Sequence, residues 1–261
     1  MKIVVSADIN SNKIYVNNLY NLTFIGKIVI KYFDNVLYTK ELTLDRDHIL
    51  WFSPYSKMSD ISKIKVIILD ENNNEFDSMI PLTYVNFMRA DDFELNKLCD
   101  LIKREGNPVS NMIEIGSYQG ESTIIFQKNF PNSKIFAVDF WLNNYDEREV
   151  NINSFNMMDV ENNFDVLTKS YSNIIKIKMS SSDFSNIIAD NSIDFIYIDG
   201  DHSYKGITND LINWKNKIKK GGYIGGHDYN DIQIDTIIKA ILENFPNYKI
   251  NIFESNWLIK L

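Results

Sequence analysis

Two short stretches in the second half of the sequence hold residue types that commonly move protons. Asp199, Asp201 and His202 lie within four consecutive residues, and His227 and Asp228 are adjacent. The chain has 3 histidines in all, and two of them stand beside carboxylates in these stretches. A lone histidine is more often structural, but an imidazole that titrates near neutral pH beside an acid suits a general base. We therefore interpret Asp201, His202 and His227 as candidate catalytic residues.

A glycine-containing stretch at residues 111–120 could hold a nucleotide cofactor. An apolar run carrying Glu114 leads into Gly116 and Gly120, and a helix-like segment follows. Glycine has no Cβ and tolerates positive φ, so such a turn lets the backbone approach a nucleotide, and the following helix start offers unpaired N–H groups. An ordinary strand–turn–helix connection would look the same, and this stretch alone does not decide between the two interpretations.

Polar residues also follow the other predicted strands. Asp139 comes about twenty residues after the glycine stretch, where an acid can accept hydrogen bonds from both ribose hydroxyls. Ser182 and Asp183 follow the next strand and are placed to meet an adenine, although capping of a helix explains them equally well. Ligands of a parallel α/β sheet bind beyond the carboxyl ends of its strands. Polar groups at five successive strand ends therefore indicate one nucleotide-cofactor site.

The elements that must position these residues alternate between strand and helix from residue 86 to 261. Such alternation, with unbroken apolar strands, is typical of a parallel sheet covered on both faces. The predicted strands are 112–115, 135–138, 174–179, 194–198, 223–226, 248–253 and 257–259. The last two have no helix between them and are expected to form an antiparallel hairpin at one edge. The helix that starts near Tyr204 is expected to continue to Ile218 and to end in a glycine cap at 219–222.

Residues 1–85 contain β-type runs and turn residues but no helical periodicity. Three hairpins are expected, and turn residues such as Asp34 and Asn35 tolerate the backbone that a tight hairpin requires. Hairpins without a helix predict a small antiparallel β-sandwich-like module, separate from a domain at 86–261. Its aromatic cluster at 51–55 could stack on a sugar ring, but core packing is the favoured interpretation.

Composition and charge argue against several kinds of partner. The net charge of −8 and the pI near 5.0 disfavour nucleic acid and an anionic membrane surface, because both normally need a basic face. No apolar run approaches the roughly 20 residues that cross a bilayer, and the N-terminal apolar run is too short for a signal peptide. The single Cys99 excludes an internal disulfide. We expect a cytoplasmic protein and leave a homo-oligomer open.

Four motifs give the sequence a specific resemblance. It resembles the class I S-adenosylmethionine-dependent methyltransferases, and within them the small-molecule group that includes sugar O-methyltransferases. The resemblance covers about residues 86–261 and leaves the N-terminal module unexplained. The motifs are Glu-Ile-Gly-Ser-Tyr-Gln-Gly at 114–120, Val-Asp-Phe-Trp at 138–141, Ile-Asp-Gly-Asp-His-Ser-Tyr-Lys-Gly at 198–206 and Lys-Gly-Gly-Tyr-Ile-Gly-Gly-His-Asp-Tyr at 220–229.

The resemblance implies a Rossmann-like α/β sheet with strand order 3-2-1-4-5-7-6 and an antiparallel seventh strand. It assigns the amino-acid end of S-adenosylmethionine to the glycine loop, the ribose to Asp139 and the adenine region to Ser182 and Asp183. The implied cofactor-binding residues are Glu114, Gly116, Ser117, Tyr118, Gly120, Ser122, Asp139, Phe140, Ser182, Asp183 and Asp199. Transfer of the sulfonium methyl to a hydroxyl then needs a base that removes or polarises the acceptor's proton.

A magnesium ion is a second way to lower the pKa of an acceptor hydroxyl. The resemblance implies Mg²⁺ bound by the acid after the fourth strand and an acidic pair after the fifth, here Asp199 with His227 and Asp228. His227 replaces a carboxylate in that pair, and Mg²⁺ prefers oxygen ligands. The metal therefore stays an open alternative, with Asp199 and Asp228 as its ligands.

The methyl acceptor is expected to be a hydroxyl of a sugar, a glycan or another small metabolite. Part of the long crossover at 141–172 contains aromatic and methionine residues and is expected to form a lid over that acceptor. A NAD-dependent oxidoreductase stays open but is disfavoured, because Tyr118 stands where a dinucleotide loop has its middle glycine. A glycan-binding protein with a non-catalytic methyltransferase-like domain is disfavoured by the intact acidic residues of the motifs.

Overall fold

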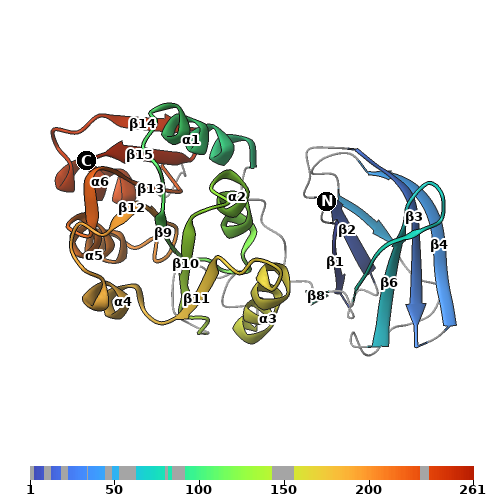
Figure 1. Ribbon diagram of the computed structural model, residues 1–261. Coiled ribbons are helices and arrows are strands. Elements are labelled where there is room, and N and C mark those ends of the chain that lie inside the picture. The colour runs from blue at the N-terminus through green and yellow to red at the C-terminus, as the bar shows by residue number, and fades with distance from the viewer. Residues whose placement is uncertain are drawn as a thin grey trace. The chain divides into compact units, whose positions relative to one another are not determined.

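The computed structural model shows a chain that divides into two compact units, Met1–Phe87 and Met88–Leu261 (Figure 1). No helix among the described residues is long and apolar enough to cross a membrane. The residues that the structure describes are 3–8, 13–18, 23–33, 35–44, 49–52, 63–79, 82–83, 92–142, 156–229 and 235–261.

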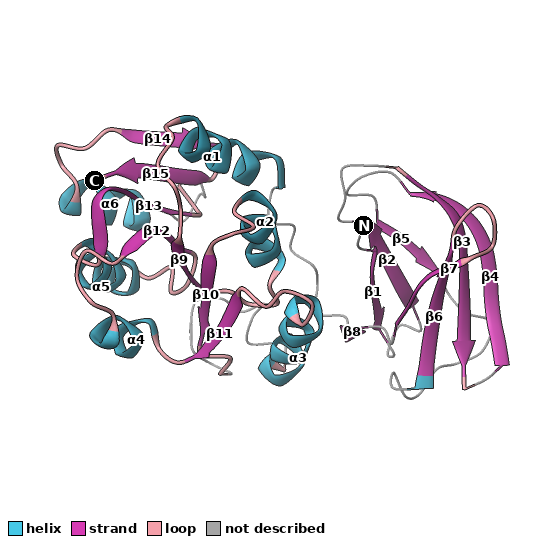
Figure 2. Cartoon of the chain, in the orientation of Figure 1, coloured by secondary structure: helices cyan, strands magenta, loops and turns pink. Residues whose placement is uncertain are grey.

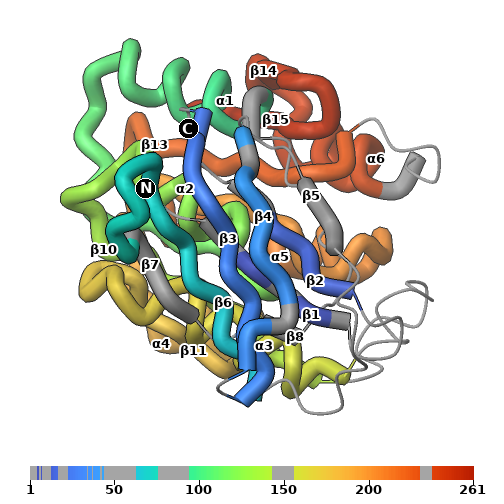
Figure 3. The backbone as a smooth tube through the Cα atoms, turned by 90° about the vertical axis from the view of Figure 1, so that its right-hand side faces the viewer, coloured from blue at the N-terminus to red at the C-terminus, as the bar shows by residue number. Residues whose placement is uncertain are grey.

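The N-terminal unit contains two four-stranded sheets, ordered β5-β2-β1-β8 and β4-β3-β6-β7. Figure 3 shows β4, β3 and β6 of the second sheet running side by side. The strands are β1 (Ile3–Asp8), β2 (Lys13–Asn18), β3 (Phe24–Tyr32), β4 (Asn35–Leu44), β5 (Ile49–Phe52), β6 (Ile64–Leu69), β7 (Glu75–Met79) and β8 (Leu82–Thr83). The three predicted hairpins are confirmed as the pairs β1–β2, β3–β4 and β6–β7.

The core of this unit lies between its two sheets, as in a sandwich. Alternate residues of β1 and β2, such as Val5 and Ile14, join Ile28 and Ile30 of β3 and Val66 of β6 in one buried apolar cluster. Alternation arises because successive side chains of a strand point to opposite faces. One pair departs from the predicted antiparallel pattern, since β8 lies parallel to β1. The interpretation of the aromatic cluster at 51–55 stays a prediction, because those side chains lie outside the described residues.

The C-terminal unit is a seven-stranded sheet with helices on both faces (Figure 2). Its helices are α1 (Asp92–Arg104), α2 (Glu121–Asn129), α3 (Met157–Thr168), α4 (Ser181–Ile187), α5 (Tyr204–Lys215) and α6 (Asp235–Asn244). Its strands are β9 (Asn111–Ile115), β10 (Lys134–Asp139), β11 (Ile174–Lys178), β12 (Ile193–Ile198), β13 (Ile218–Gly226), β14 (Ile250–Phe253) and β15 (Asn256–Lys260).

The strand order of this sheet is β11-β10-β9-β12-β13-β15-β14, which is 3-2-1-4-5-7-6 when its strands are numbered along the chain. The first five pair in parallel, whereas β15 is antiparallel to both β13 and β14. The expected edge hairpin is therefore present. Because β9, β10, β11, β12 and β13 are parallel, their carboxyl ends all lie at the same end of the sheet. The connections that follow these strands gather there.

Apolar side chains fix the helices to the two faces of the sheet. One buried cluster joins the strands to α4, α5 and α6, and a second joins them to α1 and α2. Figure 1 shows α1, α2 and α3 on one side of the sheet and α4, α5 and α6 on the other. Burial of apolar surface, worth about 25 cal/mol per Å², is the main favourable contribution to the free energy of this packing.

The end of α5 differs from the prediction. The helix ends at Lys215, and Ile218 already belongs to β13. A Cβ on Gly222 would lie 2.8 Å from the carbonyl oxygen of Asp194, and Lys219 Nζ donates to Asp194 Oδ1 at 2.7 Å. The close approach of β13 to β12 therefore requires a glycine at 222, where the sequence predicts a helix cap. Pairing within the sheet overrides the local helix-cap signal.

Replacing Phe126 by alanine tests the packing of α2 on the sheet. Phe126 is fully buried, and its ring lies edge-on to the rings of Phe195 and Tyr197, with centroids 5.7 and 4.9 Å away. We expect the free energy of unfolding to fall by about 3–5 kcal/mol, measured by chemical denaturation. Ile212→Ala, on the exposed face of α5, is the control and should change it by less than about 0.5 kcal/mol. Equal effects of the two substitutions would contradict the assignment of this face as core.

Candidate cofactor-binding and active site

The glycine loop between β9 and α2 passes directly against the end of β12. Gly116 has φ +84°, and a Cβ on it would lie 1.9 Å from the carbonyl oxygen of Asp199. The amide of Asp199 in turn donates to the carbonyl of Ile115 at 2.8 Å. Gly120, with φ +92°, ends the loop as the residue before the first turn of α2. Only glycine allows this approach at residue 116.

Glu114 anchors the loop from beneath. Its side chain is fully buried and accepts hydrogen bonds from Ser117 Oγ at 2.9 Å, from Ser122 Oγ at 2.5 Å and from the hydroxyl of Thr123. Burial raises the pKa of Glu114 to about 7, although the three hydroxyl donors act in the opposite direction. Glu114 thus holds the loop and the start of α2 in place. Its predicted role at the amino-acid end of the cofactor stays a prediction.

Asp139, at the end of β10, accepts hydrogen bonds from the glycine loop and from the loop that follows β10. Its Oδ2 accepts the backbone N–H of Tyr118 at 2.8 Å, and its Oδ1 accepts the backbone N–H of Trp141 at 2.8 Å. Burial raises the pKa of this carboxyl, while the backbone donors lower it. Asp139 and the following Phe140 both keep part of their surface exposed. Each carboxylate oxygen has a second lone pair, so the remaining acceptor capacity suits a ribose diol.

The predicted adenine residues form the start of α4. Ser180 caps this helix by accepting the N–H of Asp183 at 3.1 Å, and its hydroxyl donates to Asp183 Oδ2 at 2.7 Å. Ser182 and Asp183 are exposed. The capping explanation for Asp183 is therefore present in the structure, and contact of either residue with adenine stays a prediction.

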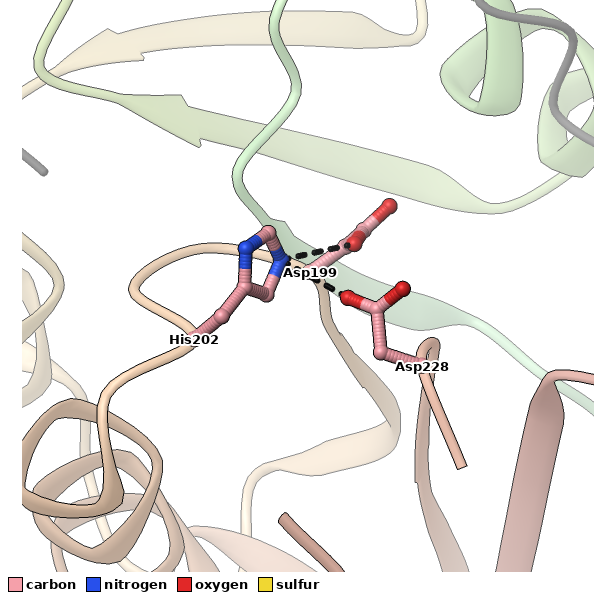
Figure 4. Close-up of side chains that lie close together, drawn as sticks. All are labelled: Asp199, His202 and Asp228. Atoms are coloured by element: carbon pink, nitrogen blue, oxygen red, sulfur yellow. Dashed lines mark hydrogen bonds and ion pairs between the residues drawn. The ribbon is translucent and has the colours of Figure 1, made fainter. Parts of the chain in front are cut away.

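Four side chains after β12 and β13 form one cluster of carboxylates and imidazoles. Figure 4 shows three of them, with His202 Nε2 facing Asp228 Oδ2 at 2.9 Å and Asp199 Oδ1 at 3.4 Å. His227 Nδ1 lies 2.9 Å from Asp228 Oδ1 and 3.9 Å from Asp199 Oδ1. The sheet brings these residues together because β12 and β13 are parallel neighbours that end at the same level.

The two carboxylates set the charge of His227. Burial lowers the pKa of His227, but the negative charge of Asp199 and the hydrogen bond to Asp228 outweigh burial and raise this pKa to about 9. Burial likewise raises the pKa of Asp228, whereas hydrogen bonds from both imidazoles hold it below its usual range. His227 is therefore a cation and Asp228 an anion at neutral pH.

Asp201 has a different environment from the other two candidate bases. Its Oδ1 accepts the N–H of Ser203 at 2.7 Å, and a Cβ on Gly206 would lie 2.2 Å from its Cγ. The carboxyl group is thus packed on the first turn of α5. The structure places His202 and His227 in the cluster with Asp199 and Asp228, and Asp201 at the helix start beside it.

The ligand atoms of Asp199, His202 and Asp228 lie within 4.8 Å of one another, close enough for one metal ion. The set combines two carboxylates with an imidazole nitrogen. Mg²⁺ prefers all-oxygen coordination, whereas Zn²⁺, Fe²⁺ and Mn²⁺ accept mixed nitrogen and oxygen sets. These donors do not fit Mg²⁺ as the preferred ion.

Two residues of this region were missed by sequence reasoning. Thr123 is a third hydroxyl donor to Glu114, and the only signal for it is the spacing of Ser117, Ser122 and Thr123 after that acid. Trp141 was assigned to the lid segment, but its indole Nε1 donates to the carbonyl of Tyr118 at 2.7 Å. Residues 143–155 of the predicted lid lie outside the described residues.

Comparison with known proteins shows what this unit is similar to. Residues 113–229 match the family model described as a methyltransferase domain. An uncharacterized protein of Acanthamoeba polyphaga mimivirus is 30% identical over 125 residues, which are 46% of this chain and 51% of that protein. The chain thus spans about half the length of the curated relative that it matches.

Two solved structures share the fold. The O-methyltransferase NovP is 13% identical with a TM-score of 0.51, and the match covers 65% of this chain and 78% of NovP. The calicheamicin methyltransferase CalS11 is 12% identical with a TM-score of 0.50, and the match covers 67% of this chain and 81% of CalS11. Residues 113–229 are therefore similar in sequence to a methyltransferase domain, and the C-terminal unit shares its fold with two methyltransferases.

Gly116→Ala tests the close approach of the glycine loop to β12. The new Cβ would collide with backbone, and we expect the free energy of unfolding to fall by at least about 3 kcal/mol, with loss of S-adenosylmethionine binding. Gly106→Ala is a matched control, because φ is +77° there but no atom lies within 4 Å of the new Cβ. Denaturation and calorimetric titration of both variants separate the collision from the cost of positive φ. If both variants lose the same free energy of unfolding, the close approach of Gly116 to β12 is contradicted.

The donor set of the cluster predicts which ion it prefers. We expect Zn²⁺ or Mn²⁺ to bind more tightly than Mg²⁺ in calorimetric titrations of EDTA-treated protein. His202→Ala should weaken Zn²⁺ binding by about 10- to 100-fold and leave Mg²⁺ binding nearly unchanged, since only the imidazole is lost. Tighter binding of Mg²⁺ than of either transition ion would show that the oxygen ligands dominate.

Proposed function

We propose that this protein transfers the methyl group of S-adenosylmethionine to a hydroxyl of a sugar or another small metabolite. The observation that carries the proposal is the contact between Gly116 and the Asp199 carbonyl, where the missing Cβ would lie 1.9 Å from oxygen. This contact joins the cofactor loop to the cluster of Asp199, His202, His227 and Asp228. A methyl donor on the loop would therefore face groups that can handle the acceptor's proton.

The glycine loop and the end of β10 offer the groups that S-adenosylmethionine needs. The loop backbone and the first turn of α2 would hold its amino-acid end, and Asp139 with Phe140 would hold its ribose. The cofactor supplies an electrophilic methyl group on a sulfonium. The protein has to align the acceptor oxygen with that methyl and to take up the proton that the acceptor loses.

His202 is the base in this proposal. His227 already carries a proton at neutral pH, because its pKa is raised to about 9, so it acts as a donor that orients or polarises the acceptor. The Nε2 of His202 lies within 3.4 Å of both Asp199 and Asp228, which favours a proton on that nitrogen and makes Nδ1 the basic one. The two carboxylates then stabilise the imidazolium that forms, as an acid does for the histidine of a catalytic triad.

The arrangement of Tyr118 disfavours a dinucleotide oxidoreductase. Its backbone N–H is taken by Asp139 at 2.8 Å, and its side chain replaces the glycine that would let a pyrophosphate approach. The O-methyltransferase function of NovP agrees with a hydroxyl acceptor, but at 13% identity that likeness concerns the fold alone. The acceptor class is therefore part of the proposal.

A thermal-shift assay followed by mass spectrometry tests the proposed function. S-adenosylmethionine should raise the melting temperature, whereas NAD should not. The protein with S-adenosylmethionine should then be incubated with sugar nucleotides, glycans and small hydroxylated metabolites, and at least one should gain a single CH₂. A shift with NAD alone, or binding of a glycan without any methylation across the panel, would contradict the proposal.

His202→Ala tests the assignment of the base. We expect kcat to fall by about 10²- to 10⁴-fold while the Kd for S-adenosylmethionine stays within twofold, because the base acts on the acceptor. His48→Ala, in the N-terminal unit, is the control and should leave kcat unchanged. Retention of full activity by His202→Ala would contradict this assignment.

A further inference from the structure

Three residues of two neighbouring loops form a closed ring of hydrogen bonds. Tyr118 N–H donates to Asp139 Oδ2 at 2.8 Å, and Trp141 N–H donates to Asp139 Oδ1 at 2.8 Å. The indole Nε1 of Trp141 completes the ring by donating to the Tyr118 carbonyl at 2.7 Å. Both polar groups of the Tyr118 backbone are thus held by the residues that end and follow β10.

The ring holds a backbone conformation that neither bulky residue prefers. Tyr118 and Trp141 both have φ +45°, in the left-handed region. A non-glycine side chain there comes too close to its own carbonyl oxygen, so the conformation persists only when surrounding contacts enforce it. For Tyr118, in the middle of the glycine loop, the carboxylate of Asp139 and the indole of Trp141 are two such contacts.

The indole of Trp141 is itself fixed by α3 and β11. The side chain is 3% exposed, and its ring centroid lies 5.1 Å from that of Phe164. Lys176 Nζ lies 5.0 Å from the same ring and also pairs with Glu161 at 2.9 Å and Asp165 at 2.7 Å. An indole held between an aromatic ring and an anchored ammonium can direct its N–H at one target.

We propose that Trp141 is a positioning residue for the cofactor site: its indole N–H holds the glycine loop, through the Tyr118 carbonyl, in the conformation that receives S-adenosylmethionine. The inference rests on the proposed function. Trp141 acts through Tyr118 and Asp139, and it does not touch the reacting atoms. Phenylalanine would fill much of the same space but would leave the Tyr118 carbonyl without this donor.

The affinity for the cofactor should therefore depend on Trp141, which is not one of the residues that bind the cofactor. A loop that is already ordered loses less conformational entropy when a ligand binds. Removing the indole N–H should therefore raise the KM and Kd for S-adenosylmethionine. It should change kcat little at saturating cofactor, because the acceptor and the base at His202 are untouched.

The test compares two buried tryptophans in the full-length protein. Trp141→Phe should raise the Kd for S-adenosylmethionine, measured by calorimetry, about five- to tenfold, the size expected for one hydrogen bond. Trp257→Phe is the matched control. Its indole is also fully buried, but its Nε1 has no hydrogen-bond partner in the part of the chain that the structure describes. This control should leave the Kd within twofold.

A second variant separates the hydrogen bond from packing. β-(3-Benzothienyl)alanine at 141 keeps the bicyclic ring and replaces the N–H by sulfur, so it should fold like the wild type and still raise the Kd about five- to tenfold. If the wild type binds S-adenosylmethionine and both variants at 141 bind it with the same Kd, the inference is overturned and the proposed function stands. Absence of binding by the wild type would overturn both.

Discussion

The contact between the glycine loop and the end of β12 is the constraint on which the rest of the site depends. Gly116 lies so close to the Asp199 carbonyl that no other residue fits without moving backbone. The contact exists because β9 lies between β10 and β12, so the loop after β9 must pass both neighbouring strand ends. The glycine loop, the acid at the end of β10 and the cluster after β12 and β13 are thereby held together at one end of the sheet.

Hydrogen-bonded acids keep this end of the sheet ordered. A carboxyl group withdrawn from water is costly unless it is hydrogen-bonded, and the acids near the loop are hydrogen-bonded on several sides. Glu114 accepts from three hydroxyls beneath the loop, and Asp139 accepts from two backbone amides beside it. Asp228 accepts from two imidazoles. The site is therefore organised by contacts within the protein, and a ligand would meet groups already in place.

Much of the fold and part of the site could be predicted from sequence. Unbroken apolar strands, glycines and acids at strand ends predicted the sheet, its edge hairpin and the loop at 114–120. Local signals failed where tertiary pairing decided the outcome. Residues 219–222 resemble a helix cap, but they belong to β13, and a Cβ on Gly222 would lie 2.8 Å from the carbonyl oxygen of Asp194. The position of Asp201 against α5 and the left-handed backbone of Trp141 likewise depend on contacts between elements that are distant in sequence.

A crystal structure with S-adenosylhomocysteine tests the central claim most directly, because that claim concerns where the cofactor lies relative to the cluster. The account predicts ribose hydroxyls on the Asp139 carboxylate and the amino-acid end over residues 116–120. It also predicts that the sulfur faces His202 and Asp199, leaving space there for an acceptor. A ligand bound elsewhere, or a sulfur that faces away from the cluster, would contradict the account.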